Sequence, residues 1–321
     1  MKKLKIGLLV RLFYLFSVFG YAEDSCNEQF KDNLNIQGDF AYNMSQFAMI
    51  LHPEGNAANN KFGNLNVRDY KAFSTTEGEV HNGFIALTND NKVIIGFSGT
   101  DGAADWANTF AEFNKNLVSG IPGTVFGSFF DFANTIINQN NYKEKLFYYI
   151  SQIGEGKEIP IYIVGHSKGG AAANIAAFLI KHMIDDYRSE ISYTINIYTF
   201  GAPMAGDNDF SKAYNETFPE TYSYRLEGDL VPLLPPSTKA NSLTNAIGKG
   251  IDDITHIKLT NIYNEVMKTP FPVGYSLIYN KDEKRWACKG KTLESNELNN
   301  PILLDNNIHN SYNDNNYYKL K

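Results

Sequence analysis

The sequence predicts an α/β fold with a mostly parallel central sheet flanked by helices. Apolar runs with strand character alternate with stretches whose apolar residues recur at helical spacing. One such strand, at 161–164, passes through a glycine-rich turn straight into a helix of small residues at 171–183. Strands that alternate with helices favour parallel pairing through right-handed crossovers. The chain's 321 residues, 43 % of them hydrophobic, suffice for one large core without a metal or disulfide framework.

The elements are expected in a fixed order along the chain. A helix comes first, and two strands follow around a turn at Asn89-Asp90-Asn91. The strand and helix around the glycine-rich turn come next, and then two further strands. The expected ranges are helix 40–51, strands 84–87, 93–97 and 161–164, helix 171–183, and strands 191–200 and 222–226. In sheets of this kind, binding sites form at the carboxyl ends of the strands.

The first residues predict an export signal. Three lysines within the first five residues precede an apolar run at 12–19, and Gly20-Tyr21-Ala22 offers a small-x-small cleavage site. The apolar run is too short to span a bilayer. We therefore expect residues 1–22 to be removed as a signal peptide. The remaining residues, 23–321, are expected to form a single secreted, periplasmic or extracellular domain with no membrane span. An uncleaved N-terminal anchor is the alternative.

Charge and cysteine content narrow the classes of function. Four of the 29 Lys and Arg residues lie in the leader and none of the 35 Asp and Glu residues does, so the mature chain carries a net charge of −10. This acidic balance argues against nucleic-acid binding, which needs clustered cations for the phosphates. No Cys/His cluster has zinc-site spacing. The sequence as a whole implies neither a metal nor an organic cofactor. Cys26 and Cys288 either pair after export or remain free thiols.

The glycine-rich turn has the G-x-S-x-G pattern between a strand and a helix, within Gly165-His166-Ser167-Lys168-Gly169-Gly170. This context predicts that Ser167 is the nucleophile of a serine hydrolase with the α/β-hydrolase fold. The serine sits on a sharp, strained turn, so its neighbours two residues away must lack side chains, as Gly165 and Gly169 do. The backbone N–H of Lys168 is expected to bind the oxyanion. An ordinary turn with a surface serine is the alternative.

A serine hydroxyl needs a histidine to take its proton and a carboxylate to orient that histidine. In this fold both follow the serine in the chain. Asp229 lies in a loop after the last expected strand, while the competing acids Asp207 and Asp209 follow another strand. Of six histidines, only His256 and His309 follow Asp229. His256 lies in a strand-like alternation and His309 in a polar loop, where catalytic residues are more common. His309 is the expected base and His256 the alternative.

Four motifs together resemble the class 3 lipases, the fungal-type family within the α/β hydrolases. They occur in the family's order and are Gly96-Phe97-Ser98-Gly99-Thr100, Gly165 to Gly170, Tyr198-Thr199-Phe200-Gly201-Ala202-Pro203 and Asp229 to Pro236. The resemblance implies a catalytic triad of Ser167, Asp229 and His309. It supports His309 because the family's histidine often precedes a tyrosine by three positions, here Tyr312. It also assigns the second oxyanion donor to Thr100, for which a helix N-cap is the alternative role.

The chain departs from the family at three positions. Ser98 stands where the family usually has Arg, Lys168 where it has Leu, and Phe126 where a His is expected. These departures leave the triad intact and open the question of the substrate.

Residues 101–117 correspond to the lid helix of the resembling family. Trp106, Phe110, Phe113 and Leu117 form one apolar helical stripe. A mobile lid that opens at a lipid surface and a fixed helix packed on the core are equal alternatives.

These observations predict a secreted serine carboxylic ester hydrolase, a lipase that cleaves acylglycerols or other lipid esters through an acyl-enzyme. Its partner is a lipid or other ester substrate, for which a lipid–water interface is one setting. A phospholipase A1 and a non-lipid esterase of the feruloyl type are the enzymatic alternatives. A lipase-like binding protein without catalysis is the alternative of another class.

Overall fold

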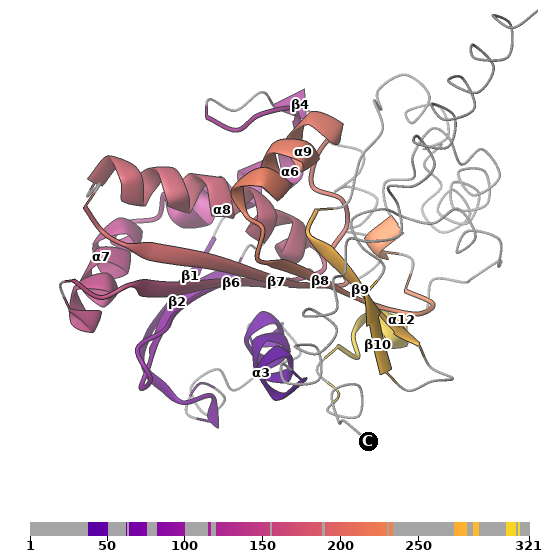
Figure 1. The fold of residues 1–321 in the computed structure, drawn as a ribbon, viewed down its shortest axis with the longest axis horizontal. Coiled ribbons are helices and arrows are strands. Elements are labelled where there is room, and N and C mark those ends of the chain that lie inside the picture. Colours follow the sequence, from indigo (N-terminus) through magenta and orange to yellow (C-terminus); the bar gives the residue numbers. More distant parts are fainter. Residues whose placement is uncertain are drawn as a thin grey trace, which may run out of the picture.

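The computed structural model describes residues 38–50, 62, 64–75, 82–99, 115–116, 120–154, 156–187, 190–229, 231–233, 273–280, 285–288, 306–312 and 314. Its main element is an eight-stranded sheet in the order β1-β2-β3-β6-β7-β8-β9-β10 (Figure 1). The strands are β1 (Val67–Ser74), β2 (Asn82–Thr88), β3 (Val93–Phe97), β6 (Ile159–His166), β7 (Tyr193–Phe200), β8 (Thr221–Leu226), β9 (Tyr275–Asn280) and β10 (Arg285–Cys288).

The middle of the sheet is parallel. Strands β3, β6, β7, β8 and β9 pair in parallel, one after the other. The pairs β1–β2, β2–β3 and β9–β10 at the two edges are antiparallel. The predicted α/β-hydrolase architecture, a mostly parallel sheet flanked by helices, is therefore confirmed. Parallel pairing brings the carboxyl ends of β3, β6, β7 and β8 to one edge of the sheet.

Helices cover both faces of the sheet. Helix α3 lies on one face, and α6, α8 and α9 lie on the other (Figure 1). Helix α7 contributes buried side chains to the same apolar core as α6 and α8. The bounds are α3 (Gly38–Met49), α6 (Gly127–Ile137), α7 (Tyr142–Ile153), α8 (Lys168–Tyr187), α9 (Asn208–Thr217) and the single turn α12 (Asn306–His309).

Strand β6 shows how the sequence pattern builds these two layers. Ile161 and Ile163 pack into the core on the α8 side, while Val164 packs into the core on the α3 side. Side chains that alternate along a strand point to opposite faces, so a strand with apolar residues on both faces is buried from both sides. The small residues that begin α8 let this helix lie close to the sheet, and its Ala171, Ala172 and Ala173 are fully buried.

Most expected elements are present with shifted ends. The strand expected at 161–164 extends to Ile159–His166, and the helix expected at 171–183 begins at Lys168. The turn after Thr88 is present, with Asn91 at a φ of 61°. The short 3-10 turn η1 (Val231–Leu233) begins the segment after Asp229.

The prediction that one helix continues to Leu117 is wrong in its last turn. Lys115 and Asn116 form the short strand β4, which pairs antiparallel with β5 (Val125–Phe126). The chain can return between these strands because Gly120 and Gly123 take positive φ angles of 83° and 75°. The rest of the expected lid lies outside the described residues, as do the leader and Cys26. Cys288, at the end of β10, is disulfide-bonded.

Candidate active site

Ser167 occupies a sharp turn between β6 and α8. Its φ is 55°, a left-handed value that non-glycine residues rarely adopt. The backbone holds this conformation, since the N–H of Ser167 donates to the carbonyl of Phe200 (2.9 Å) and its carbonyl accepts from the N–H of Gly170 (2.9 Å). Ser167 is 1 % exposed, and its hydroxyl makes no hydrogen bond to the described residues. A strained serine kept by its surroundings is typical of a functional position.

The glycines of the motif are required by close approach of the backbone. A Cβ on Gly165 would lie 2.3 Å from the carbonyl oxygen of Gly169. A Cβ on Gly169 would lie 2.3 Å from the carbonyl oxygens of both Phe97 and Ser98, at the end of β3. Strand, turn and helix can therefore meet only without side chains at these positions, as the sequence predicts.

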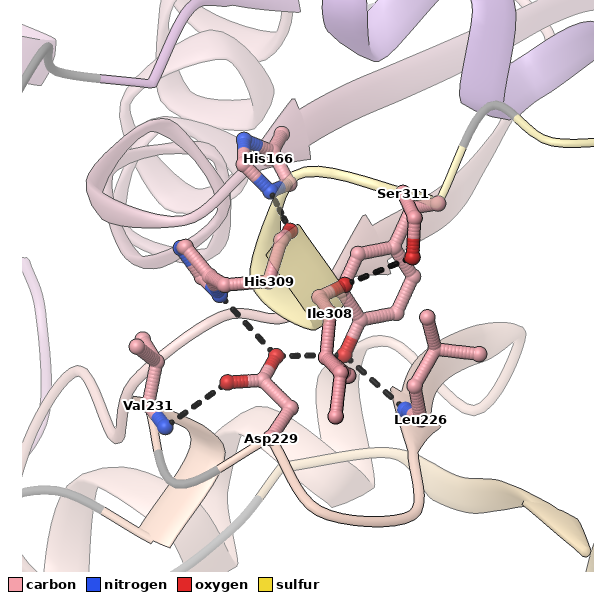
Figure 2. Close-up of polar contacts among 8 residues, drawn as sticks. His166, Leu226, Asp229, Val231, Ile308, His309 and Ser311 are labelled. Carbon is pink, nitrogen blue, oxygen red and sulfur yellow. Dashed lines mark hydrogen bonds and ion pairs between the residues drawn. The ribbon is translucent and has the colours of Figure 1, made fainter. Parts of the chain in front are cut away.

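Asp229 lies in the turn that follows β8 and is held by three donors. Its Oδ1 accepts from the backbone N–H of Val231 (2.9 Å). Its Oδ2 accepts from Nδ1 of His309 (2.9 Å) and from the hydroxyl of Tyr312 (2.6 Å), as Figure 2 shows. Asp229 is 4 % exposed and His309 is 7 % exposed. A buried carboxylate is stable only when hydrogen-bond donors surround it, and these three donors meet that need.

His309 ends α12 and points its ring at Asp229 (Figure 2). Because Nδ1 donates its proton to the carboxylate, Nε2 is the ring nitrogen left to accept a proton. The ring of His309 lies 4.7 Å from the ring of His166, the residue directly before Ser167. The structure thus brings the predicted acid and base into one hydrogen-bonded pair beside the predicted nucleophile.

Gly201, after β7, makes room for this pair. It has a φ of 59°, and a Cβ on it would lie 2.9 Å from Oδ2 of Asp229 and 3.0 Å from Cε1 of His309. A side chain here would therefore both strain the backbone and push the acid and base apart. The sequence motif contained this glycine, but spacing alone did not indicate that it borders the pair.

Tyr312 is a site residue whose contacts the sequence did not reveal. It is fully buried, and its hydroxyl donates to Asp229 while accepting from the backbone N–H of Leu226 (2.9 Å). Burial, and then the neighbouring carboxylate, raise the pKa of Tyr312 well above its ordinary value, so the phenol stays protonated and remains a donor. Its position three residues after His309 was the only signal.

We expect Tyr312→Phe to lower kcat on a short p-nitrophenyl ester by about tenfold, the equivalent of one lost hydrogen bond of about 1.4 kcal/mol. It should also destabilise the fold, because the N–H of Leu226 loses its acceptor. Tyr214→Phe is the matched control, since its buried hydroxyl donates to Asn174 (3.0 Å) instead of Asp229. An unchanged kcat in Tyr312→Phe, with equal destabilisation of both variants, would contradict the role.

Of the other residues singled out from the sequence, the structure describes Lys168, Asp207 and Asp209. Lys168 begins α8 with its side chain 1 % exposed, and its N–H belongs to the helix's first turn, whose N–H groups have no intrahelical carbonyl. Asp207 caps α9 through Phe210 N–H (3.0 Å), and Asp209 is exposed, so neither competes with Asp229. Thr100 and His256 lie outside the described residues.

In the part of the chain that the structure describes, no three His, Cys, Asp or Glu side chains are grouped so that they could hold a metal ion. Within the same residues, no helix is long and apolar enough to cross a membrane.

The chain is similar in sequence to a known family of proteins. Residues 94–239 match the lipase (class 3) family. Lipase ZK262.3 of Caenorhabditis elegans is 38 % identical over 110 residues, which span 33 % of this chain and only 30 % of that protein. The predicted resemblance to class 3 lipases of the α/β-hydrolase superfamily is confirmed.

Solved structures show the same fold. A lipase from Rhizopus microsporus var. chinensis superposes with a TM-score of 0.60 at 18 % identity, over 85 % of this chain and 86 % of that one. The lipase of Rhizomucor miehei in its propeptide complex gives a TM-score of 0.57 at 17 % identity, over 88 % and 80 % of the two chains.

Proposed function

We propose that this chain, with its class 3 lipase pattern, is an exported serine hydrolase of lipid esters. The observation that carries the proposal is the hydrogen-bonded pair of His309 and Asp229 beside a serine on a strained strand–helix turn. That arrangement provides a nucleophile, a carboxylate and a base, which follow one another along the chain in the order that the fold requires.

The first half of the proposed reaction forms an acyl-enzyme. The hydroxyl oxygen of Ser167 attacks the ester carbonyl carbon while Nε2 of His309 takes the hydroxyl proton. Asp229 stabilises the resulting imidazolium through Nδ1. The tetrahedral intermediate then collapses, the bond to the alcohol oxygen breaks, and His309 returns the proton to that oxygen. The alcohol leaves and the acyl group stays on Ser167.

The second half releases the acid. A water molecule gives a proton to His309 and attacks the acyl carbonyl, and the second intermediate collapses to return the proton to Ser167. In both halves the negative oxygen is held by the backbone N–H groups of Lys168 and Thr100. The position of Lys168 at the start of α8 supports this assignment, because the helix dipole also favours negative charge there.

The substrate class rests on the lipase family match and on burial. The relatives named above are lipases, and an acylglycerol or other lipid ester is the substrate that such a likeness favours. Ser167 and His309 are both buried, so an ester in free solution has restricted access to them. A site that opens at an apolar surface fits this restriction.

Export is proposed from the basic start, apolar run and cleavage site of residues 1–22. The check is the mass of the protein recovered outside the cytoplasm, which should correspond to a chain that begins at Glu23. Recovery of the uncleaved chain in the membrane fraction would contradict it.

The lipid-ester assignment is tested by measuring tributyrin hydrolysis below and above its solubility limit. We expect the rate to rise by about tenfold or more as emulsion appears, because burial of the site restricts access in free solution. Ser167→Ala, measured in parallel, controls for hydrolysis by contaminants. A smooth saturation curve through the solubility limit, together with faster turnover of a feruloyl ester, would favour a non-lipid esterase instead.

A further inference from the structure

His166, which precedes the nucleophile, makes a direct contact with the segment that carries the base. Its Nε2 lies 2.8 Å from the backbone carbonyl oxygen of His309 (Figure 2). A carbonyl oxygen only accepts hydrogen bonds, so Nε2 of His166 carries the proton and donates it. His166 is 1 % exposed, and a buried hydrogen bond of this kind is stronger than one on the surface.

The acceptor, the carbonyl oxygen of His309, lies at the end of a helix that supplies no N–H partner for it. The last carbonyls of a helix have no N–H partner within the helix, and His309 is the final residue of the one-turn helix α12. Ser311 binds the carbonyl of the preceding residue, Ile308, through its N–H (3.1 Å) and its hydroxyl (2.8 Å). His166 therefore supplies the hydrogen-bond donor for the carbonyl of His309 at this helix end.

The ring of His166 also fills the space between three parts of the site. It lies 4.7 Å from the ring of His309 and 5.7 Å from that of Tyr312, measured between centroids. On its other side, a Cβ on Gly99 would lie 2.9 Å from Nδ1. Gly99 directly precedes Thr100, the proposed oxyanion donor. One buried ring thus borders the nucleophile turn, the oxyanion loop and the base.

We propose that His166 is a positioning residue that sets the direction of the His309 ring through the backbone carbonyl of His309. This rests on the proposed function of Ser167, Asp229 and His309. The ring of His309 is held at Nδ1 by Asp229, and its backbone is held by His166. The bond to Asp229 holds one ring nitrogen, and the bond from His166 holds the backbone from which the ring extends, so the two together set where Nε2 faces.

The expected consequence concerns the rate of the chemical step. Loss of the second attachment lets Nε2 drift from the hydroxyl of Ser167, and a displacement on the order of 1 Å can cost about 10²-fold in rate. The hydrogen bond joins two parts of the protein and does not join the protein to the substrate, so KM should change little. A lower kcat with an almost constant KM is the pattern of an interaction that matters in the transition state.

The test compares His166→Phe with His166→Gln in the full chain. Phenylalanine keeps a ring against His309 and Tyr312 but has no donor, whereas the glutamine amide carries an N–H about as far from the backbone as Nε2. We expect His166→Phe to lower kcat on p-nitrophenyl butyrate by about 10- to 100-fold with KM within about twofold of wild type. His166→Gln should recover kcat to within about fivefold of wild type.

Controls separate this role from packing and from failure of the proposed function. His182→Phe and His182→Gln alter a half-buried histidine farther along α8 and should leave kcat unchanged. If Phe and Gln at position 166 lose kcat equally, or if His166→Phe keeps wild-type kcat, the proposal is wrong. If His166→Phe does not fold, His166→Leu takes its place in the same comparison. Turnover by wild type that Ser167→Ala fails to abolish would instead refute the proposed function.

Discussion

Ser167→Ala is expected to lower kcat by at least about 10⁴-fold, because without the hydroxyl no acyl-enzyme forms and only binding and oxyanion stabilisation remain. The variant should fold as well as wild type. The hydroxyl makes no hydrogen bond to the described residues, and alanine meets the same backbone strain at a φ of 55°. Turnover of p-nitrophenyl butyrate and thermal unfolding, measured on one preparation, check both statements.

The outcome that would contradict the nucleophile assignment is turnover within about tenfold of wild type in a correctly folded Ser167→Ala variant. Loss of turnover that accompanies loss of the folded state would not support it either. Ser223→Ala, in β8, provides the control for folding, since the hydroxyl of Ser223 donates to the carbonyl of Val273 (3.0 Å), two residues before β9.

His309→Ala is expected to lower kcat by about 10⁴-fold, while His256→Ala stays within about threefold of wild type. His309 lies 2.9 Å from Asp229 through Nδ1, and both side chains are buried. Removal of the imidazole leaves the serine hydroxyl without a base and Asp229 without one of its three donors. The measurement is kcat for both variants on the same short ester.

The reverse result, in which His256→Ala loses turnover and His309→Ala keeps it, would overturn the assignment of the base. Asp229→Asn gives a second check on the same pair. An amide in place of the carboxylate can no longer stabilise the imidazolium or fix its tautomer, so kcat should fall by about 10⁴-fold with little change in KM.

The sequence was most informative where local geometry restricts residue type. The turn around Ser167 could be predicted because only glycine fits the close approaches at Gly165 and Gly169. The place of β6 in the middle of the sheet could be predicted because its apolar run at 161–164 is typical of a strand buried on both faces. Both signals lie within a few residues of the feature that they predict.

Features that depend on distant contacts could not be predicted. Helix α6 was not predicted from the sequence; in the structure its Phe129 and Phe132 are buried in the core that α6 shares with the sheet and α8. Strand β9 is positioned by pairing with β8, about fifty residues earlier, and no local pattern encodes that partner.

Two of the three departures from the family, Ser98 directly after β3 and Lys168 at the start of α8, are buried beside the nucleophile. Ser98 is 2 % exposed, its carbonyl abuts Gly169, and its hydroxyl makes no hydrogen bond to the described residues. Lys168 is 1 % exposed. Lysine is almost never fully buried, so its burial could not be predicted from the sequence. The part of the chain that the structure describes gives no reason for a serine at position 98.

The central claim is that Ser167 is activated as a nucleophile by His309 and Asp229. The most direct measurement is to treat the folded protein with a fluorophosphonate, digest it, and identify the labelled residue by mass spectrometry. The account predicts one adduct per chain, on Ser167, and a labelling rate that falls by about 10³-fold or more in His309→Ala. An adduct on a different serine, or no adduct on a protein that hydrolyses esters, would contradict it.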